Sequence, residues 1–180
     1  MAHVKRRLLI VDGYNVMNAW AGAMKGRNGD AISEARDKLI TRLEDYAGYS
    51  GQKMIVVFDA WQSDRTTRTV ENTGVLEVVF TQHGETADHY IERLCDEYAR
   101  EVEMDRLEIR VATSDSVEQT VVLGRGATRM SARELLYEID AVRKEAHGVQ
   151  KPMTVRKKST VMDQLPEDIR QKLEALRRGK

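Results

Sequence analysis

The sequence predicts an α/β protein, built on a mainly parallel sheet with helices on both faces. Two observations lead to this fold class. Four short runs of apolar residues suit strands that are buried on both faces. The segments between several of them carry apolar residues at helical spacing, and strands that alternate with helices form a parallel sheet. The 180 residues are enough for one such domain.

The first two predicted strands both end on an aspartate. The first strand is Arg7–Asp12 and the second is Lys53–Asp59. Residues 13–30, which are rich in Gly, Asn and Ala, are predicted to form a long loop after the first strand. Residues 30–46 then form a helix, which an aspartate caps at its start and two glycines end.

The second half of the chain continues this alternation. Its predicted elements are a polar loop (62–74), a third strand (Val75–Phe80), a helix (Thr86–Glu101), a fourth strand (Leu107–Thr113), a short helix (116–122), a fifth strand (Ala127–Met130) and a helix over 132–146 that Ser131 caps.

From residue 147 onward the alternation stops and the charge becomes positive. Residues 147–180 hold nine Lys and Arg against four acids, a net charge of +5, although the whole chain is neutral. We therefore expect a domain over residues 1–146, followed by a basic arm and helix over residues 147–180. An acidic body with a basic tail is compatible with a nucleic-acid partner in spite of the zero net charge.

Several classes of protein are excluded by what the sequence lacks. No apolar run approaches the roughly 20 residues of a membrane span, and no signal peptide precedes the first strand. The single cysteine, Cys95, suits a reducing compartment, so we expect a soluble, cytoplasmic protein with no membrane partner. Phosphate-binding glycine loops and the H-E-x-x-H zinc motif are both missing.

Carboxylates gather where the predicted strands end. Asp12, Asp59 and Asp115 close or directly follow three strands, Asp88 lies in the first turn of a helix, and Glu92 follows it by four residues. Sites in parallel α/β sheets form at this edge. Like charges there repel one another unless a cation neutralises them, and Mg²⁺ or Mn²⁺ prefers carboxylate oxygens. The pattern predicts a metal site able to polarise a phosphodiester.

Each carboxylate also has a purely structural interpretation. Asp12 and Asp115 suit helix or turn caps, and Asp88 suits the positive end of its helix. Glu92 suits a solvated helix face, and Asp59 is expected to lie too far along the sheet for a ligand. The set as a whole favours the metal site over these interpretations.

Four segments resemble one known family. They are LLIVDGYNVMNAW (Leu8–Trp20), VVFDA (Val56–Ala60), GETADHYIE (Gly84–Glu92) and VATSDSVEQ (Val111–Gln119). Over residues 5–146 the chain resembles the YacP-type NYN branch of the PIN-like nuclease superfamily, a group that includes ribosome-associated endoribonucleases. The resemblance implies a three-layer α/β/α PIN-like domain.

The resemblance also implies an activity and roles for the motif residues. The activity is metal-dependent endonucleolytic cleavage of single-stranded RNA, which leaves 3′-hydroxyl and 5′-phosphate ends. The implied substrate is mRNA, and the ribosome is a further candidate partner. The implied metal ligands are Asp12, Asp88 and Asp115, with Glu92 as a further ligand. Asn15 would bind a ligand water or orient Asp12. The residues around the ligands would be Ser114 and Asp59, and Glu92 has this position as its alternative role.

An acidic pocket repels RNA, so basic groups elsewhere must hold the backbone through salt-dependent contacts that are blind to sequence. The residues we expect to do so are Arg6, Arg7, Arg65, Arg68, Arg125, Lys157 and Lys158. Trp20 is a candidate for stacking on a base, and its alternative role is packing at the edge of the domain.

Two other functions stay open at this point. The first is an NYN module that binds RNA or the ribosome without cleaving, although converging acids give such a surface no advantage. The second is a magnesium-dependent hydrolase of small phosphate esters, which needs a closed pocket. RNA sequence preference, the number of metals and the oligomeric state do not follow from the sequence.

Overall fold

The computed structural model describes residues 4–20, 29–60, 66–114, 124 and 126–149. Residues 1–144 form one unit of the chain and residues 145–180 a second. The predicted basic arm and terminal helix, and the short helix expected over residues 116–122, lie outside the described residues. Within those residues no helix is long and apolar enough to cross a membrane.

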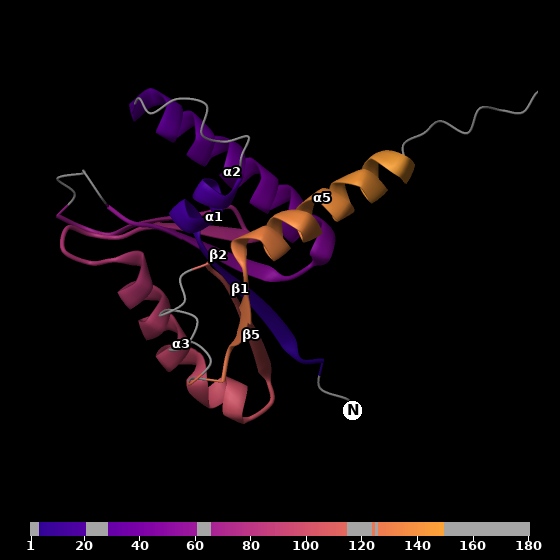
Figure 1. Ribbon diagram of the computed structural model, residues 1–180. Coiled ribbons are helices and arrows are strands. Elements are labelled where there is room, and N and C mark those ends of the chain that lie inside the picture. Colours follow the sequence, from indigo (N-terminus) through magenta and orange to yellow (C-terminus); the bar gives the residue numbers. More distant parts are fainter. Residues whose placement is uncertain (1–3, 21–28, 61–65, 115–123, 125, 150–180) are drawn as a thin grey trace, which may run out of the picture. The chain divides into compact units, whose positions relative to one another are not determined.

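The described residues form six strands and four helices, which include the five predicted strands (Figure 1). They are β1 (Arg6–Asp12), α1 (Gly13–Ala19), α2 (Gly29–Ser50), β2 (Lys53–Phe58), β3 (Thr69–Asn72), β4 (Leu76–Phe80), α3 (Ala87–Glu103), β5 (Leu107–Ala112), β6 (Thr128–Met130) and α5 (Ala132–Val149).

The strands form one sheet in the order β3-β4-β2-β1-β5-β6. All neighbouring pairs are parallel except β3 with β4, so the prediction of a mainly parallel sheet is confirmed. In β1, Asp12 pairs with Val57 of β2 on one side, and Val11 pairs with Ala112 of β5 on the other. The carboxyl ends of these three strands therefore meet at one edge of the sheet.

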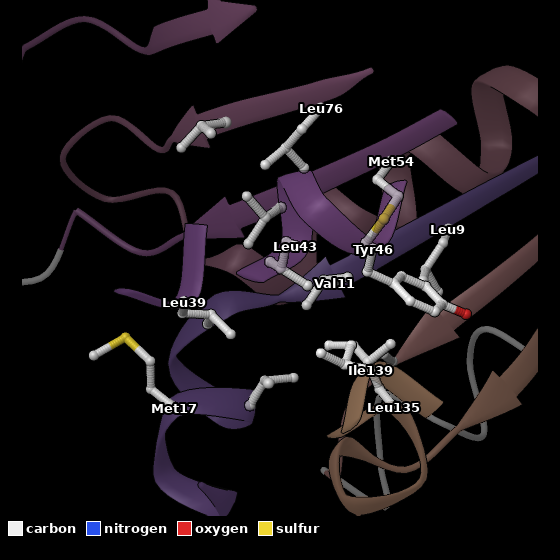
Figure 2. Packing of buried hydrophobic residues seen from close by; sticks show 14 of the residues in the cluster. Leu9, Val11, Met17, Leu39, Leu43, Tyr46, Met54, Leu76, Leu135 and Ile139 are labelled. Carbon is white, nitrogen blue, oxygen red and sulfur yellow. The ribbon is translucent and has the colours of Figure 1, made fainter. Parts of the chain in front are cut away.

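Alternate residues of each central strand enter two separate cores. Leu9 and Val11 of β1 pack with α1, α2 and α5, whereas Leu8 and Ile10 pack with α3. Figure 2 shows part of the first core, where Leu135 of α5 and other apolar side chains converge on one face of the sheet. Because each face of the sheet is covered by helices, the unit has the three-layer α/β/α architecture.

The structure confirms the predicted starts of α3 and α5, whereas the prediction that Asp30 caps α2 is wrong, because this helix begins at Gly29 and Asp30 lies inside it. The Thr86 hydroxyl accepts a hydrogen bond from the His89 N–H at the start of α3. At the start of α5, Ser131 and Glu134 bond each other's backbone N–H groups, which is the reciprocal arrangement of a capping box. These caps satisfy N–H groups that have no partner within the helix.

The prediction of a loop over residues 13–30 is wrong for its first part, which is helix α1. The Asp12 side chain caps this helix, and Val16 and Met17 are buried in the first core. The capping bond and this burial offset the low helical propensity of Gly and Asn, on which the loop prediction rested. Helix α2 likewise continues past Gly48 to Ser50 and stops before Gly51, whose φ of 64° is left-handed.

Strand β3 is a second difference, because the segment was predicted to be a polar loop. Its four residues are mostly exposed and show no apolar alternation. They pair antiparallel with β4, with Thr69 opposite Phe80 and Asn72 opposite Glu77. Backbone hydrogen bonds to an edge of the sheet place this strand, and such bonds leave no signature in the side chains.

Gly13 follows Asp12 directly and lies against the ring of Phe58. A Cβ atom built on Gly13 would overlap that ring, and Phe58 is fully buried between Tyr14 and Phe80. The absence of a side chain at residue 13 therefore lets α1 begin immediately after β1, next to the end of β2.

We expect Gly13→Ala to destabilise the protein by about 1–3 kcal/mol, because Phe58 has to move within a packed core. The control is Gly48→Ala, at an exposed helical position with no atom near the added methyl; it should stabilise α2 by roughly 0.5–1 kcal/mol. Urea unfolding followed by circular dichroism measures both changes. Equal stability of the Gly13 variant and the wild type would contradict the overlap.

Candidate functional site

A pocket of about 440 Å³ lies at the carboxyl ends of β1 and β2. It is bounded by α1, the start of α2 and the start of α3. The residues that line it are Asp12, Tyr14, Asn15, Met17, Asn18, Ile32, Asp59, Thr86, Ala87 and Asp88. Three of the carboxylates that the sequence singles out therefore share one pocket with the predicted Asn15.

Asp12 is held in place at the junction of β1 and α1. Its side chain is only 8% exposed, and its Oδ1 accepts a hydrogen bond from the Asn15 N–H at 3.0 Å. The structural interpretation of Asp12 as a helix cap is thus observed. The same residue lines the pocket, so the cap fixes the orientation of a carboxylate that the pocket contains.

Asn15 connects three segments that are distant in the sequence. Its backbone donates to Asp12, and its side-chain Oδ1 accepts a hydrogen bond from the Ser114 N–H at 2.9 Å. The Ser114 hydroxyl in turn accepts from the Ala132 N–H at 3.3 Å. The end of β1, the segment after β5 and the start of α5 are therefore joined beside the pocket.

Asp59 and Asp88 approach the pocket from different elements. Asp59 comes one residue after β2 and is half-buried, so the structure brings it to the pocket in spite of the expectation that it lies too far along the sheet. Asp88 comes from the first turn of α3, close to the positive end of that helix. Glu92, one turn later, does not line the pocket.

The predicted third ligand, Asp115, lies outside the described residues. Among the residues that the structure does describe, no three His, Cys, Asp or Glu side chains are grouped closely enough to hold a metal ion. The ligand set of Asp12, Asp88, Asp115 and Glu92 therefore stays a prediction. The donors that line the pocket are carboxylate and amide oxygens, and these suit Mg²⁺ or Mn²⁺ better than a softer metal.

One wall of the pocket was not predicted. Tyr14, Met17 and Ile32 add apolar side chains to the lining that holds the carboxylates. These side chains could not be assigned to the pocket because residues 13–30 were predicted to be a loop. The apolar residues at positions 16, 17 and 20 follow a helical spacing, which is the signal that could have identified the helix.

Comparisons with known proteins agree with this geometry. The family model of the YacP-like NYN domain matches residues 9–178. The chain belongs to this family. The match extends through the basic tail, whereas the resemblance noted from the sequence ended at residue 146.

Relatives of this NYN domain are similar to it over nearly their whole length. The uncharacterized protein YacP of Bacillus subtilis strain 168 is 38% identical over 172 residues, which is 96% of this chain and 97% of that protein. A crystal structure of Rae1 (YacP) from Bacillus subtilis is 37% identical with a TM-score of 0.66, covering 96% of this chain and 95% of that one. A crystal structure of a tryptophan-to-leucine mutant of Rae1 (YacP) from Bacillus subtilis is 34% identical with a TM-score of 0.64, covering 94% of this chain and 99% of that one.

A charged cluster lies beside the pocket of this NYN domain, just before α3. Glu85, whose side chain is 10% exposed, accepts hydrogen bonds from Arg68 at 2.6 and 3.2 Å and pairs with Arg93 at 2.9 Å. Both guanidinium groups lie over the Tyr90 ring, 4.6 and 4.9 Å from its centroid. Arg68, predicted to contact RNA, is thus at the correct edge of the sheet.

The other basic residues of the prediction are placed differently. Arg6 and Arg7 lie at the opposite end of β1, about 20 Å from Asp12 by strand geometry; Arg6 pairs with Glu101, and Arg7 donates to the Ser50 carbonyl. The remaining four, Arg65, Arg125, Lys157 and Lys158, lie outside the described residues. RNA contacts by any of these residues stay predictions.

Trp20 packs against the first core, and the Arg42 guanidinium lies 4.4 Å from the centroid of its ring. It does not line the pocket. The structure therefore favours the alternative role of Trp20, packing at the edge of the domain, over base stacking in this pocket.

Glu85 links stability to pH. Burial alone would raise its pKa, but the hydrogen bonds from Arg68 and Arg93 bring the pKa below the ordinary 4.5. We expect Glu85→Gln to lower the free energy of unfolding by about 1 kcal/mol at neutral pH. This loss should shrink as the pH falls below 4.5, because the wild-type carboxylate then takes up a proton.

Unfolding by urea at a series of pH values measures this difference. Glu71→Gln removes the same charge from exposed strand β3 and serves as the control. A loss in the Glu85 variant that stays constant from neutral pH down to pH well below 4.5 would contradict the ion-paired role of this carboxylate.

Proposed function

We propose that the protein is a metal-dependent endoribonuclease that cleaves single-stranded RNA. The observation that carries the proposal is the convergence of Asp12, Asp59 and Asp88 on one pocket at the carboxyl edge of the sheet. The family relation supports a nuclease-type function that acts on RNA. Metal dependence and the choice of RNA strand rest on the chemistry of the pocket.

The charge of the pocket favours catalysis over simple binding of RNA. Asp12, Asp59 and Asp88 line one pocket, and their negative charges repel phosphate. A divalent cation held by these acids would offset that repulsion, since such cations prefer carboxylate and phosphate oxygens. A surface evolved only to hold RNA would gain nothing from these three acids.

The chain's own residues prepare the site. Asp12 and Asp88 are the proposed ligands that the structure describes, and Asp115 is the third. When bound, Mg²⁺ or Mn²⁺ would polarise the phosphodiester and favour deprotonation of an attacking water. Asn15 keeps Asp12 in place through its backbone N–H and fixes the segment before Asp115 through its bond to Ser114.

The apolar wall supports an unpaired strand as the substrate. Tyr14, Met17 and Ile32 face the same space as the acids, and an unstacked base or ribose offers an apolar surface of suitable size. Bases of a duplex are stacked and paired, so they cannot reach such a wall. We propose mRNA as the RNA and the ribosome as a further partner, which follows from the family resemblance and assigns the activity to the cytoplasm.

The first test is cleavage of an end-labelled, unstructured RNA in the presence of Mg²⁺ or Mn²⁺. We expect internal cuts by the wild type, inhibition by EDTA, and a loss of at least about 100-fold in Asp12→Asn, because one charged oxygen donor becomes an amide. Asp45→Asn, on the exposed part of α2, is the matched control and should cleave like the wild type.

The other outcomes identify the competing functions. A wild type that is inert on free RNA and on translating ribosomes, but binds RNA, would be a binding module. Hydrolysis of a chromogenic phosphate ester without RNA cleavage would indicate the small-ester hydrolase. Equal RNA cleavage by the wild type and Asp12→Asn would show that the catalytic site lies elsewhere.

Metal binding can be tested without the reaction. Since the folded pocket gathers carboxylates that the unfolded chain keeps apart, Mn²⁺ or Mg²⁺ should raise the melting temperature Tm of the wild type. We expect this rise to vanish in Asp88→Asn and to persist in Asp45→Asn, as measured by differential scanning fluorimetry with and without EDTA. A rise that is equal in all three proteins would place the ion outside the pocket.

A further inference from the structure

A second groove, of about 580 Å³, lies between strand β6 and helix α5. β6 is the last strand of the sheet, so one side of the groove is an edge of the sheet. The side chains that decide its character are Arg129 on β6 and Arg133 and Tyr137 on α5. All three are exposed, whereas Leu135, between the last two, is fully buried.

Helix geometry explains why Arg133 and Tyr137 point away from the core. Leu135 and Ile139 of α5 face the sheet, as Figure 2 shows. A residue two positions from each is rotated by about 200°, to the opposite side of the helix. Arg133 and Tyr137 are four residues apart and so lie next to each other on that outer side. Tyr137 is 77% exposed, the most exposed aromatic side chain among the described residues.

The acids of the groove already have partners. Glu138 pairs with Arg110 at 2.8 Å and accepts a hydrogen bond from the Tyr46 hydroxyl at 2.7 Å. Glu134 accepts from the Ser131 N–H at 2.7 Å as part of the helix cap. The lining of the groove holds three arginines against these two glutamates, and Glu134 also interacts with Arg129, so the groove offers a ligand an excess of one positive charge.

The groove lies near the acidic pocket. β6 is parallel to β1 and two strands away, which is a lateral distance of roughly 10 Å. Ser114 connects the two sites directly, since it bonds Asn15 beside the pocket and Ala132 at the start of α5. Arg133 lies in the first turn of α5, next to Ala132, and Tyr137 lies one turn later.

We propose that this groove binds a segment of the RNA strand outside the cleavage pocket, with a base stacked on Tyr137 and a phosphate held by Arg133. This rests on the proposed action on RNA and deepens it by naming where the strand runs. An exposed aromatic ring beside cations is the arrangement that binds single-stranded nucleic acid without sequence preference. The groove that Tyr137 lines holds more arginines than acids, and cations suit a phosphate backbone better than the apolar centre of a protein interface.

The test measures binding of a fluorescein-labelled, unstructured RNA by anisotropy, with EDTA present so that no cleavage occurs. Tyr137→Ala should raise Kd about tenfold, and Tyr137→Phe should keep near wild-type affinity, since stacking needs the ring and not the hydroxyl. Arg133→Ala should lower the slope of log Kd against log salt by about one. The matched controls are Tyr49→Ala and Arg106→Ala, which are exposed outside the groove and should change neither quantity.

The outcomes separate this proposal from the proposed function. If the wild type binds and cleaves RNA and the groove variants behave like the controls, the groove proposal is overturned and the nuclease stands. If the wild type neither binds nor cleaves RNA, both fail. Unchanged RNA binding together with loss of self-association in Tyr137→Ala, seen by sedimentation, would assign the groove to a second copy of the chain and also overturn the proposal.

Discussion

The candidate site depends on a short chain of hydrogen bonds that begins at Asp12. Asp12 accepts from Asn15, Asn15 accepts from Ser114, and Ser114 accepts from Ala132. These bonds join the central strand to the segment after β5 and to the start of α5. The parallel sheet brings the strand ends to one edge, but it does not fix the directions in which their side chains point. The bonds then fix the orientation that a site of converging oxygen atoms requires.

The same region carries costs that the rest of the fold must offset. Three carboxylates share a pocket, and the backbone has to turn from β1 into α1 against the ring of Phe58. Around these features lie two fully apolar cores, one on each face of the sheet. Burial of that kind contributes far more than repulsion among a few acids takes away, so the fold tolerates a charged edge. The arrangement is typical of sites where function and stability conflict.

Most of the fold could be predicted from the sequence, because strands such as β2 are continuous apolar runs and helices such as α3 carry a clear apolar period. The wrong predictions of element type concern two short segments, helix α1 and strand β3. Residues 13–19 have poor helical propensity, and their helix depends on a cap and on burial that appear only in three dimensions. Strand β3 is set by backbone pairing at an edge. In both places tertiary contacts override the pattern of residue types.

The candidate site was predictable in its carboxylates but not in its walls. Aspartates at strand ends could be identified from the sequence because the carboxyl edge of a parallel sheet is a known meeting point. Asp59 shows the limit of that argument, since only the structure places it in the same pocket as Asp12. The apolar wall and the outer face of α5 needed the correct helix boundaries, so that their residues could be assigned to a face.

The position of β1 at the centre of the sheet also has a consequence for synthesis of the protein. β1 is the first strand made, and it pairs with β5, where Arg6 lies opposite Leu107. At roughly 5–20 residues per second, β5 leaves the ribosome several seconds after β1. During that interval this central strand, whose residues from Leu8 to Asp12 are buried in the finished fold, lacks one of its two neighbours. The growing chain is therefore more exposed to misfolding before β5 is made than after it.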